Sequence, residues 1–150
     1  MGAVIIWLER GLVLALHDRQ LAEHGGSSGV RDEGLLESAL ARPQPLHAYG
    51  DPPPDLADLA ATLAFGLARN HPFVDGNKRT AAVACESFIE LNRGELLAED
   101  AELFPVFLAV AEGHMKVEEF APWLRAHMAP TPPRGVHEPR PRYRRTKRAA

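Results

Sequence analysis

The residues best suited to chemistry lie together in one segment, HPFVDGNKR at 71–79. Its nine residues include an imidazole, a carboxylate, a side-chain amide and two cations. An imidazole can take a proton from an attacking hydroxyl near neutral pH. A carboxylate suits Mg²⁺, and cations bind phosphate oxygens. This combination indicates transfer of a phosphorus-containing group from a magnesium-bound nucleotide to a hydroxyl.

The first half of this segment has three expected roles. His71 is the expected general base. Asp75 is the expected magnesium ligand, because Mg²⁺ prefers a carboxylate together with phosphate oxygens and water. Phe73 alternates with the polar positions and is expected to anchor the segment in the core. The segment has no paired His and Cys spacing that would indicate zinc.

The second half is expected to bind phosphate where a helix begins, because a helix N-terminus offers unpaired amide donors and a partial positive charge. Gly76 lacks the Cβ that would keep a phosphate off the backbone. Asn77 is expected to cap the helix through its oxygen while its amide faces a ligand. Lys78 adds a point charge and Arg79 a bidentate fork. The Asn-Lys-Arg ending excludes a P-loop, which requires Gly-Lys-Ser/Thr.

The elements that must hold this segment in place are helices. Apolar residues recur at helical spacing over 9–24, 32–42, 55–67, 77–93, 100–113 and 117–128. The stripe of the first helix is Leu14, His17 and Leu21, and we interpret a lone histidine such as His17 as a surface or satisfied core residue. Pro43 and Pro45 are expected to stop the second helix.

The segments from residue 77 onward are also expected to be helical, so the predicted fold is mainly α. The fourth helix is expected to bury Ala81, Cys85, Phe88 and Ile89, and the fifth Phe104, Phe107, Leu108 and Ala111. The only strand candidates are residues 4–8 and 95–98. We therefore expect a compact bundle of the six-helix type, with a flexible glycine-rich loop after the first helix and little or no β structure.

Length and composition predict one domain in a reducing compartment. The chain has 150 residues, a size typical of one domain. Its single cysteine, Cys85, excludes an internal disulfide. No apolar run approaches the ~20 residues needed to cross a bilayer, and the first residues lack the basic region of a signal peptide. We expect a cytoplasmic protein without a membrane segment.

Charge divides the chain into two parts. Residues 1–129, the expected domain, carry 10 Lys and Arg against 19 Asp and Glu. Residues 130–150 carry seven Lys and Arg, five prolines and one acid, Glu138. This composition is typical of a disordered, solvated tail. The alternative is a basic arm for nucleic acid or an acidic partner.

Residues 71–79 resemble the signature of the Fic/Doc family, HxFx(D/E)(G/A)N followed by basic residues. The lysine after the asparagine resembles the Doc, or death-on-curing, branch, as do residues 15–18, 24–26 and 35–43. The likeness spans roughly residues 4–127 and implies a compact all-α Fic fold with a flap loop.

The resemblance also implies a function. Doc-type toxins use ATP and Mg²⁺ to phosphorylate a threonine of elongation factor Tu, which arrests translation, and they are neutralised by a Phd-like antitoxin. By position, His71 would be the general base, Asp75 the metal-anchoring acid and Phe73 the structural anchor. The nucleotide phosphates would be held by Gly76, Asn77, Lys78 and Arg79. The target-docking flap would comprise Gly25, Gly26, Gly29 and Val30.

Two alternatives stay open. Most Fic proteins transfer AMP, and Gly76 matches their pattern, whereas Lys78 fills the space that a glycine leaves in those proteins and so favours presenting the γ-phosphate. The other alternative is an inactive module that binds an antitoxin and co-represses its operon. Neither Glu-Gly pair matches the self-inhibitory motif S/T-x-x-x-E-G/N, which implies inhibition by a partner at Arg79. Contact with nucleic acid is expected only through the antitoxin or the basic tail.

Overall fold

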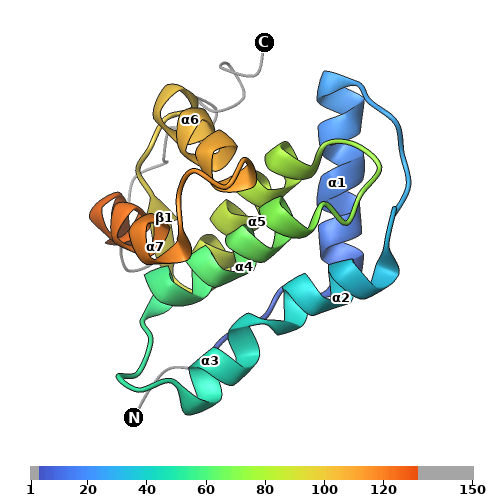
Figure 1. Ribbon diagram of the computed structural model, residues 1–150. Coiled ribbons are helices and arrows are strands. Elements are labelled where there is room, and N and C mark those ends of the chain that lie inside the picture. The colour runs from blue at the N-terminus through green and yellow to red at the C-terminus, as the bar shows by residue number, and fades with distance from the viewer. Residues whose placement is uncertain (1–3, 132–150) are drawn as a thin grey trace.

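The computed structural model describes residues 4–131, which form seven helices and one two-stranded sheet (Figure 1). The helices are α1 (Arg10–His24), α2 (Glu33–Ala41), α3 (Pro43–Tyr49), α4 (Leu56–Asn70), α5 (Asn77–Leu91), α6 (Asp100–Ala111) and α7 (Val117–Ala126). The strands are β1 (Gly94–Leu96) and β2 (Met128–Pro130). The mainly α prediction is confirmed, with one short helix more than the apolar periodicity indicates.

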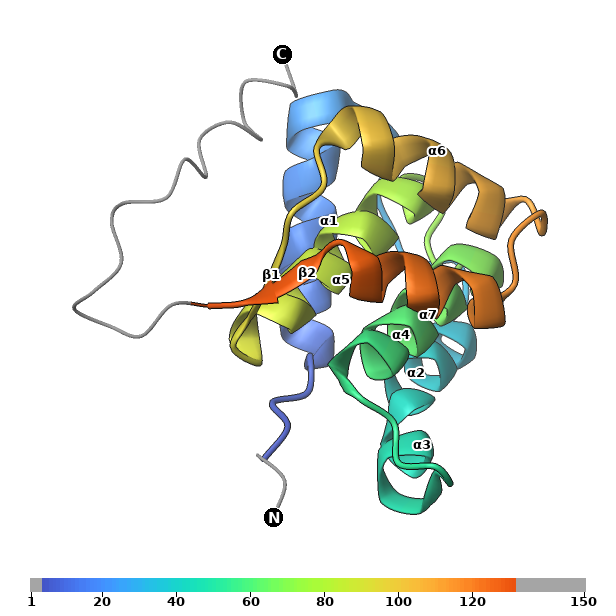
Figure 2. The same ribbon diagram turned by 90° about the vertical axis from the view of Figure 1, so that its left-hand side faces the viewer.

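The middle of the molecule is occupied by α4, which is apolar on most of its surface. Its buried residues are five alanines, three leucines and Gly66. Such small side chains let neighbouring helices approach closely, and a Cβ on Gly66 would lie only 3.2 Å from the Cα of Ala39 in α2. As a result α4 packs against α2, α3, α5, α6 and α7 (Figures 1 and 2).

The helix that carries the chemical segment, α5, lies beside α4 and is buried along one face. The expected inward residues Ala81, Cys85, Phe88 and Ile89 are all fully buried. Burial raises the pKa of the Cys85 thiol, so this side chain acts as a small core residue and not as a thiolate. Because α1 packs on another side of α5, the start of α5 is fixed from two directions (Figure 1).

The second helix ends before Pro43 and Pro45, as expected, but helical structure does not end there. The last residue of this helix is Ala41, and α3 begins after one intervening residue, with Pro43 as its first residue and Pro45 as its third. The first N–H groups of a helix have no partner inside the helix, so proline is tolerated there. The chain therefore turns between two short helices without leaving helical geometry.

Residues 4–8 do not form the expected strand. Instead, the backbone of Ile6 pairs with a side-chain amide: its N–H donates to Oδ1 of Asn92 at 2.7 Å, and Nδ2 of Asn92 donates to its carbonyl at 2.9 Å. The second strand candidate is partly confirmed by β1, which pairs antiparallel with β2. Met128, expected at the end of the last helix, lies in β2 opposite Leu96.

The predicted tail, residues 130–150, lies outside the described residues except for Pro130 and Thr131. Thr131 continues the β2 contacts, because its N–H donates to the carbonyl of Arg93 at 3.0 Å. The boundary of the tail stays a prediction. Among the helices within residues 4–131, none combines the length and the apolarity that a membrane crossing requires.

Candidate active site

The loop 71–76 joins α4 to α5 through two residues with left-handed backbones. His71 ends α4 with φ 49° and ψ 57°, and Gly76 precedes α5 with φ 75°. Glycine adopts this conformation freely, whereas for a residue with a Cβ it costs about 1–2 kcal/mol. The contacts around His71 must therefore hold it in place.

Arg31 supplies those contacts. Its Nε donates to the carbonyl of His71 at 2.7 Å, and its Nη2 donates to the carbonyl of Asn70 at 2.9 Å. The backbone N–H groups of Arg31 and Asp32 both donate to the carbonyl of Pro72, at 2.7 and 3.1 Å. The end of α4 is thus tied to the segment before α2, while His71 itself stays exposed.

The glycines and valine expected to form the flap lie alongside this loop. Gly25 ends α1 with φ 81°, and the chain then runs past the loop toward α2 (Figure 1). Val30 forms an isolated antiparallel bridge with Phe73, and the N–H of Val74 donates to the carbonyl of Gly29 at 3.0 Å. The expected flap and the chemical segment therefore form one connected unit.

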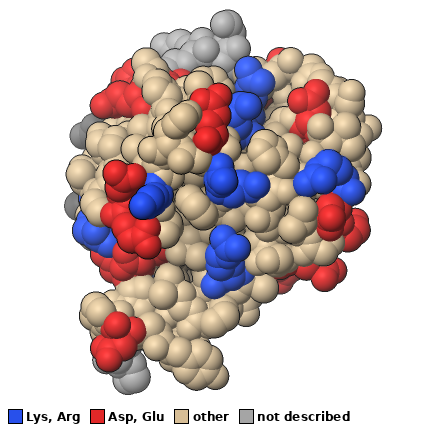
Figure 3. Space-filling view, viewed as in Figure 1, with Lys and Arg blue, Asp and Glu red and all other residues tan. Residues whose placement is uncertain are grey.

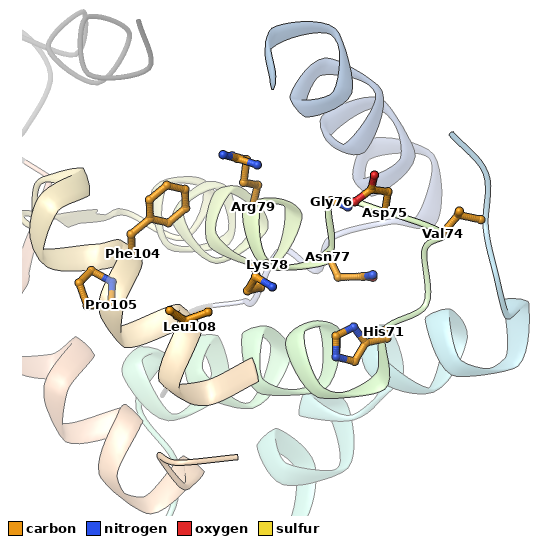
Figure 4. Close-up of a pocket in the computed structure, with 10 residues that line it drawn as sticks. All are labelled: His71, Val74, Asp75, Gly76, Asn77, Lys78, Arg79, Phe104, Pro105 and Leu108. Atoms are coloured by element: carbon orange, nitrogen blue, oxygen red, sulfur yellow. Dashed lines mark hydrogen bonds between the residues drawn. The ribbon is translucent and has the colours of Figure 1, made fainter. Parts of the chain in front are cut away.

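The carboxylate of Asp75 faces this flap. Its Oδ2 accepts the N–H of Ser27 at 3.2 Å, and its Oδ1 accepts the N–H of Gly76 at 2.9 Å. These hydrogen bonds, with Ser27 the larger cause, lower the pKa of Asp75, so the carboxylate is ionised at neutral pH. A Cβ on Gly26 would lie 2.9 Å from Oδ2, so only glycine allows this approach. Figure 4 shows the carboxylate directed away from the His71 ring.

Phe73 and Asn77 hold the two ends of the loop together. The Phe73 side chain is 1% exposed. Its backbone N–H donates to Oδ1 of Asn77 at 2.9 Å, and Nδ2 of Asn77 donates to its carbonyl at 3.0 Å. The expected side-chain cap by Asn77 is wrong, because the N-cap residue is Gly76 and the Asn77 amide braces the loop instead.

The first turn of α5 concentrates positive charge. Gly76 has no side chain with which to cap the helix, and the first turn contains no acidic residue. Lys78 and Arg79 add two cations to the positive end of the helix dipole. Figure 3 shows basic side chains along the middle of this face with acidic side chains on both flanks. The arrangement favours an anion at the start of α5.

A cavity of about 640 Å³ opens beside this turn. It is lined by His71, Val74, Asp75, Gly76, Asn77, Lys78, Arg79, Phe104, Pro105 and Leu108. In Figure 4 His71 lies at one end and the α6 side chains at the other, with Lys78 between them. The structure thus brings together the expected base, the expected metal ligand and all four expected phosphate-binding residues.

The wall formed by α6 differs from the sequence prediction. Phe107 and Ala111 are buried as expected, but Phe104 is 43% and Leu108 41% exposed, and both line the cavity. The guanidinium carbon of Arg79 lies 5.5 Å from the centre of the Phe104 ring, a cation–π contact. Apolar periodicity could not reveal this, because residues that line a cavity and residues that fill a core follow the same spacing.

A second residue that sequence reasoning left without a role is His17 of α1. It is 2% exposed, its Nε2 lies 2.8 Å from the carbonyl oxygen of Asp75, and its ring stacks on Phe73 with 3.9 Å between ring centres. The only signal in the sequence was a histidine within an apolar stripe. The partners of His17 are far away in the chain, so the stripe alone could not identify them.

Comparison with known proteins identifies a family and two relatives. Residues 7–89 match the Fic/DOC family. The chain is 53% identical over 76 residues to a protein named Toxin Doc from Mycolicibacterium smegmatis, an alignment that covers 50% of this chain and 58% of that protein. It is 34% identical over 113 residues to Protein kinase doc of Escherichia phage P1, covering 75% of this chain and 88% of that protein.

The chain spans little more than half of the length of the mycobacterial relative and most of the length of the phage relative. The family match includes α1 to α4, the chemical segment and most of α5, and so all the cavity-lining residues except those of α6. On this basis the chain belongs to the Fic/DOC family.

Proposed function

We propose that this chain is a toxin of the death-on-curing type, which transfers the γ-phosphate of ATP to a hydroxyl of a translation protein. The acceptor we propose is a threonine of elongation factor Tu, and the outcome is arrest of translation. The observation that carries the proposal is the start of α5, where Gly76, two cations and His71 surround one cavity. Family membership and the kinase name of the phage relative add support.

The residues around the cavity can divide the reaction between them. His71 takes the proton of the acceptor hydroxyl, whose oxygen attacks the γ-phosphorus as the bond to the β–γ bridging oxygen breaks. The electron pair of that bond leaves with ADP. Lys78, Arg79 and the N–H groups in the first turn of α5 stabilise the negative charge on the phosphate oxygens.

Asp75 is the residue that would hold Mg²⁺. Its ionised carboxylate keeps lone pairs beyond those that accept the N–H groups of Ser27 and Gly76. Within residues 4–131, no three His, Cys, Asp or Glu side chains gather into a metal site. A lone carboxylate fits Mg²⁺, which takes its other ligands from phosphates and water. When bound, Mg²⁺ would neutralise charge on the phosphates.

Lys78 favours phosphate transfer over AMP transfer. Its charged side chain lines the cavity directly after Asn77, at the position where AMP-transferring Fic proteins carry glycine (Figure 4). Gly76 permits both reactions, because the absence of a methyl group obstructs neither orientation of the nucleotide. AMP transfer is therefore the second candidate, and it would place the α-phosphate beside His71.

A Phd-like antitoxin is the partner that we propose for control of the toxin. The relative from M. smegmatis is named a toxin, and the self-inhibitory glutamate motif is missing from both Glu-Gly pairs. Exposed apolar side chains rim the cavity at Val74, Phe104 and Leu108. A partner that covers this rim would also cover Arg79 and so block the phosphate site.

The decisive experiment is transfer from labelled ATP. Purified protein is incubated with elongation factor Tu, MgCl₂ and ATP labelled at either the α or the γ phosphate. We expect label on the factor from γ-labelled ATP only. Label from α-labelled ATP would establish AMP transfer instead, and no label from either, with other translation proteins also tried, would favour an inactive binding module.

The first prediction concerns the proposed base. His71→Ala should lower the rate of transfer by about 10²- to 10⁴-fold, the usual contribution of a general base. His114→Ala is the matched control, because that side chain is 74% exposed and does not line the cavity. Both variants should keep the thermal midpoint of the parent protein. A His71→Ala variant with undiminished transfer would rule out this assignment.

A further inference from the structure

His17 contacts the chemical loop without entering the cavity. It is 2% exposed and does not line the cavity, so it cannot touch a bound nucleotide or acceptor. Its Nε2 lies 2.8 Å from the carbonyl oxygen of Asp75. Because a carbonyl oxygen only accepts hydrogen bonds, Nε2 must carry the proton and donate it. The imidazole therefore donates a hydrogen bond to one backbone carbonyl of the loop, that of Asp75.

The ring of His17 is itself locked in place. It stacks on the buried ring of Phe73 with 3.9 Å between centres and 10° between planes. It also lies close to Gly76: a Cβ at that residue would be 3.7 Å from both Cδ2 and Nε2 of His17. One side chain from α1 thus contacts three positions of the loop, at residues 73, 75 and 76.

The held carbonyl belongs to the peptide that joins Asp75 to Gly76. A trans peptide is planar, so its carbonyl and its N–H point in opposite directions. Fixing the carbonyl toward α1 fixes the N–H of Gly76 on the other side, where it meets Oδ1 of Asp75. The same peptide sets the direction from which the chain enters the first turn of α5.

Gly76 cannot fix this orientation by itself. Glycine adopts positive and negative φ about equally readily, so the peptide before it can turn over at little cost. Gly76 leaves room for a phosphate, but for the same reason it leaves the backbone N–H groups that would bind the phosphate without a fixed orientation. An outside contact has to select one orientation.

We propose that His17 is the positioning residue that selects one orientation of the Asp75–Gly76 peptide. Its hydrogen bond to the Asp75 carbonyl fixes that peptide and, through it, the phosphate-binding donors at the start of α5. This inference rests on the proposed function, since it assigns phosphate to those donors. It concerns the orientation of the loop, however, and can be tested without any transfer reaction.

Three variants separate the hydrogen bond from the packing. His17→Gln keeps a donor near the position of Nε2 but loses the aromatic ring. His17→Phe keeps a ring against Phe73 but has no donor, and His17→Leu is a second variant without a donor if a phenyl ring does not fit. His47→Phe is the matched control, because His47 also makes a ring contact, with Trp7, away from the cavity.

The first readout is the backbone amide resonance of Gly76 in ¹⁵N-labelled full-length protein, with pyrophosphate as the titrant. For the variants without a donor we expect this resonance to shift or broaden and the affinity for pyrophosphate to fall about 10- to 100-fold. His17→Gln should stay within about threefold of the parent protein, and the His47→Phe control should not change. Rescue by glutamine identifies the donor as the cause, because glutamine loses the ring stack.

The second readout is kinetic. A variant that is only less stable has fewer folded molecules, so its apparent kcat falls while its KM for Mg-ATP stays constant. Misplaced phosphate donors should instead raise KM and lower the kcat of the folded protein. Both constants are therefore measured well below the thermal midpoint of each variant.

Three results would overturn the inference. They are an unchanged Gly76 resonance in a folded variant without a donor, parental pyrophosphate affinity in that variant, and an equal loss in His17→Gln. Failure of the proposed function gives a different pattern: the parent protein would transfer no label or bind no pyrophosphate. In that case the Gly76 resonance still shows whether His17 orients the loop.

Discussion

The first turns of α4 and α5 are completed in opposite ways, although the two helices lie side by side (Figure 1). At the start of α4, Oδ1 of Asp55 accepts the N–H of Asp58 at 2.9 Å, and Oδ2 of Asp58 accepts the N–H of Asp55 at 3.0 Å. Arg125 then binds both carboxylates, at 2.7 to 3.0 Å. Negative charge thus meets the positive end of the helix.

At the start of α5 the charges have the opposite sign. The N-cap is Gly76, and the first turn carries Lys78 and Arg79. The Nε of Arg79 is buried without a hydrogen-bond partner among the described residues. Cations at this end of a helix are unfavourable by a few tenths to 1 kcal/mol each. A first turn whose N–H groups are capped by acidic side chains stabilises the fold, whereas a first turn without such a cap supplies a site for an anion.

Of the changes that test this comparison of the two helix starts, removing charge at the start of α5 should have the largest effect. Arg79→Gln is expected to lower the rate of transfer by about 100-fold, the scale of losing one donor to a developing charge. Its free energy of unfolding should stay within about 1 kcal/mol of the parent, because the lost cation–π contact is offset by relief at the helix terminus. Urea unfolding and labelled-ATP transfer measure the two quantities. A large loss of stability with unchanged transfer would mean that Arg79 stabilises the fold and does not serve the reaction.

Ligand binding should complete the first turn of α5 in the way that side chains complete that of α4. Mg-ATP at about 100 times its dissociation constant should raise the free energy of unfolding by about 2.7 kcal/mol. Asp55→Ala should show the same increase and Arg79→Gln little of it, as measured by thermal unfolding with and without Mg-ATP. Equal responses in both variants would place the phosphates elsewhere.

Removing the cap of α4 should weaken the fold and leave the reaction unchanged. Asp55→Ala is expected to lower the free energy of unfolding by about 1 kcal/mol at pH 7. Asp18→Ala, at an exposed position in the middle of α1, is the control. Equilibrium unfolding measures the loss, and transfer by the folded variant should equal that of the parent. Impaired transfer in a folded Asp55→Ala variant would contradict the view that the start of α4 serves stability and only the start of α5 serves the reaction.

The same carboxylate gives a pH dependence with a definite sign. Hydrogen bonds from Arg125, as the largest cause, lower the pKa of Asp55. A carboxylate whose pKa is lower in the folded state stabilises the fold when ionised. That stabilisation is fully present above the unfolded pKa, about 4, and is lost as the pH falls toward the folded value. The difference between parent and Asp55→Ala should therefore shrink below about pH 4.

Local rules predicted the helices and the chemical segment, because both depend on residues close together in the chain. The stripe that buries Phe88 and Ile89 is an example, as is the gathering of seven cavity residues within 71–79. Contacts between distant residues decided what could not be predicted. Asn77 offered a cap but binds Phe73. His17 is a satisfied core residue, one of the two interpretations of a lone histidine, but its partner, the carbonyl of Asp75, lies 58 residues away and could not be identified.

The smallest effect should come from the ion pair that covers the start of α4. Arg125 binds Asp55 at the surface, with 46% and 52% of the two side chains exposed, so water and salt screen the attraction. A double-mutant cycle of Arg125→Ala and Asp55→Ala should give a coupling energy of about 0.2–1 kcal/mol, decreasing at high salt. The cap from Asp55 to the N–H of Asp58 is a hydrogen bond within one turn and should persist in salt. A coupling energy well above 1 kcal/mol would mean that the ion pair, and not the cap, distinguishes α4 from α5.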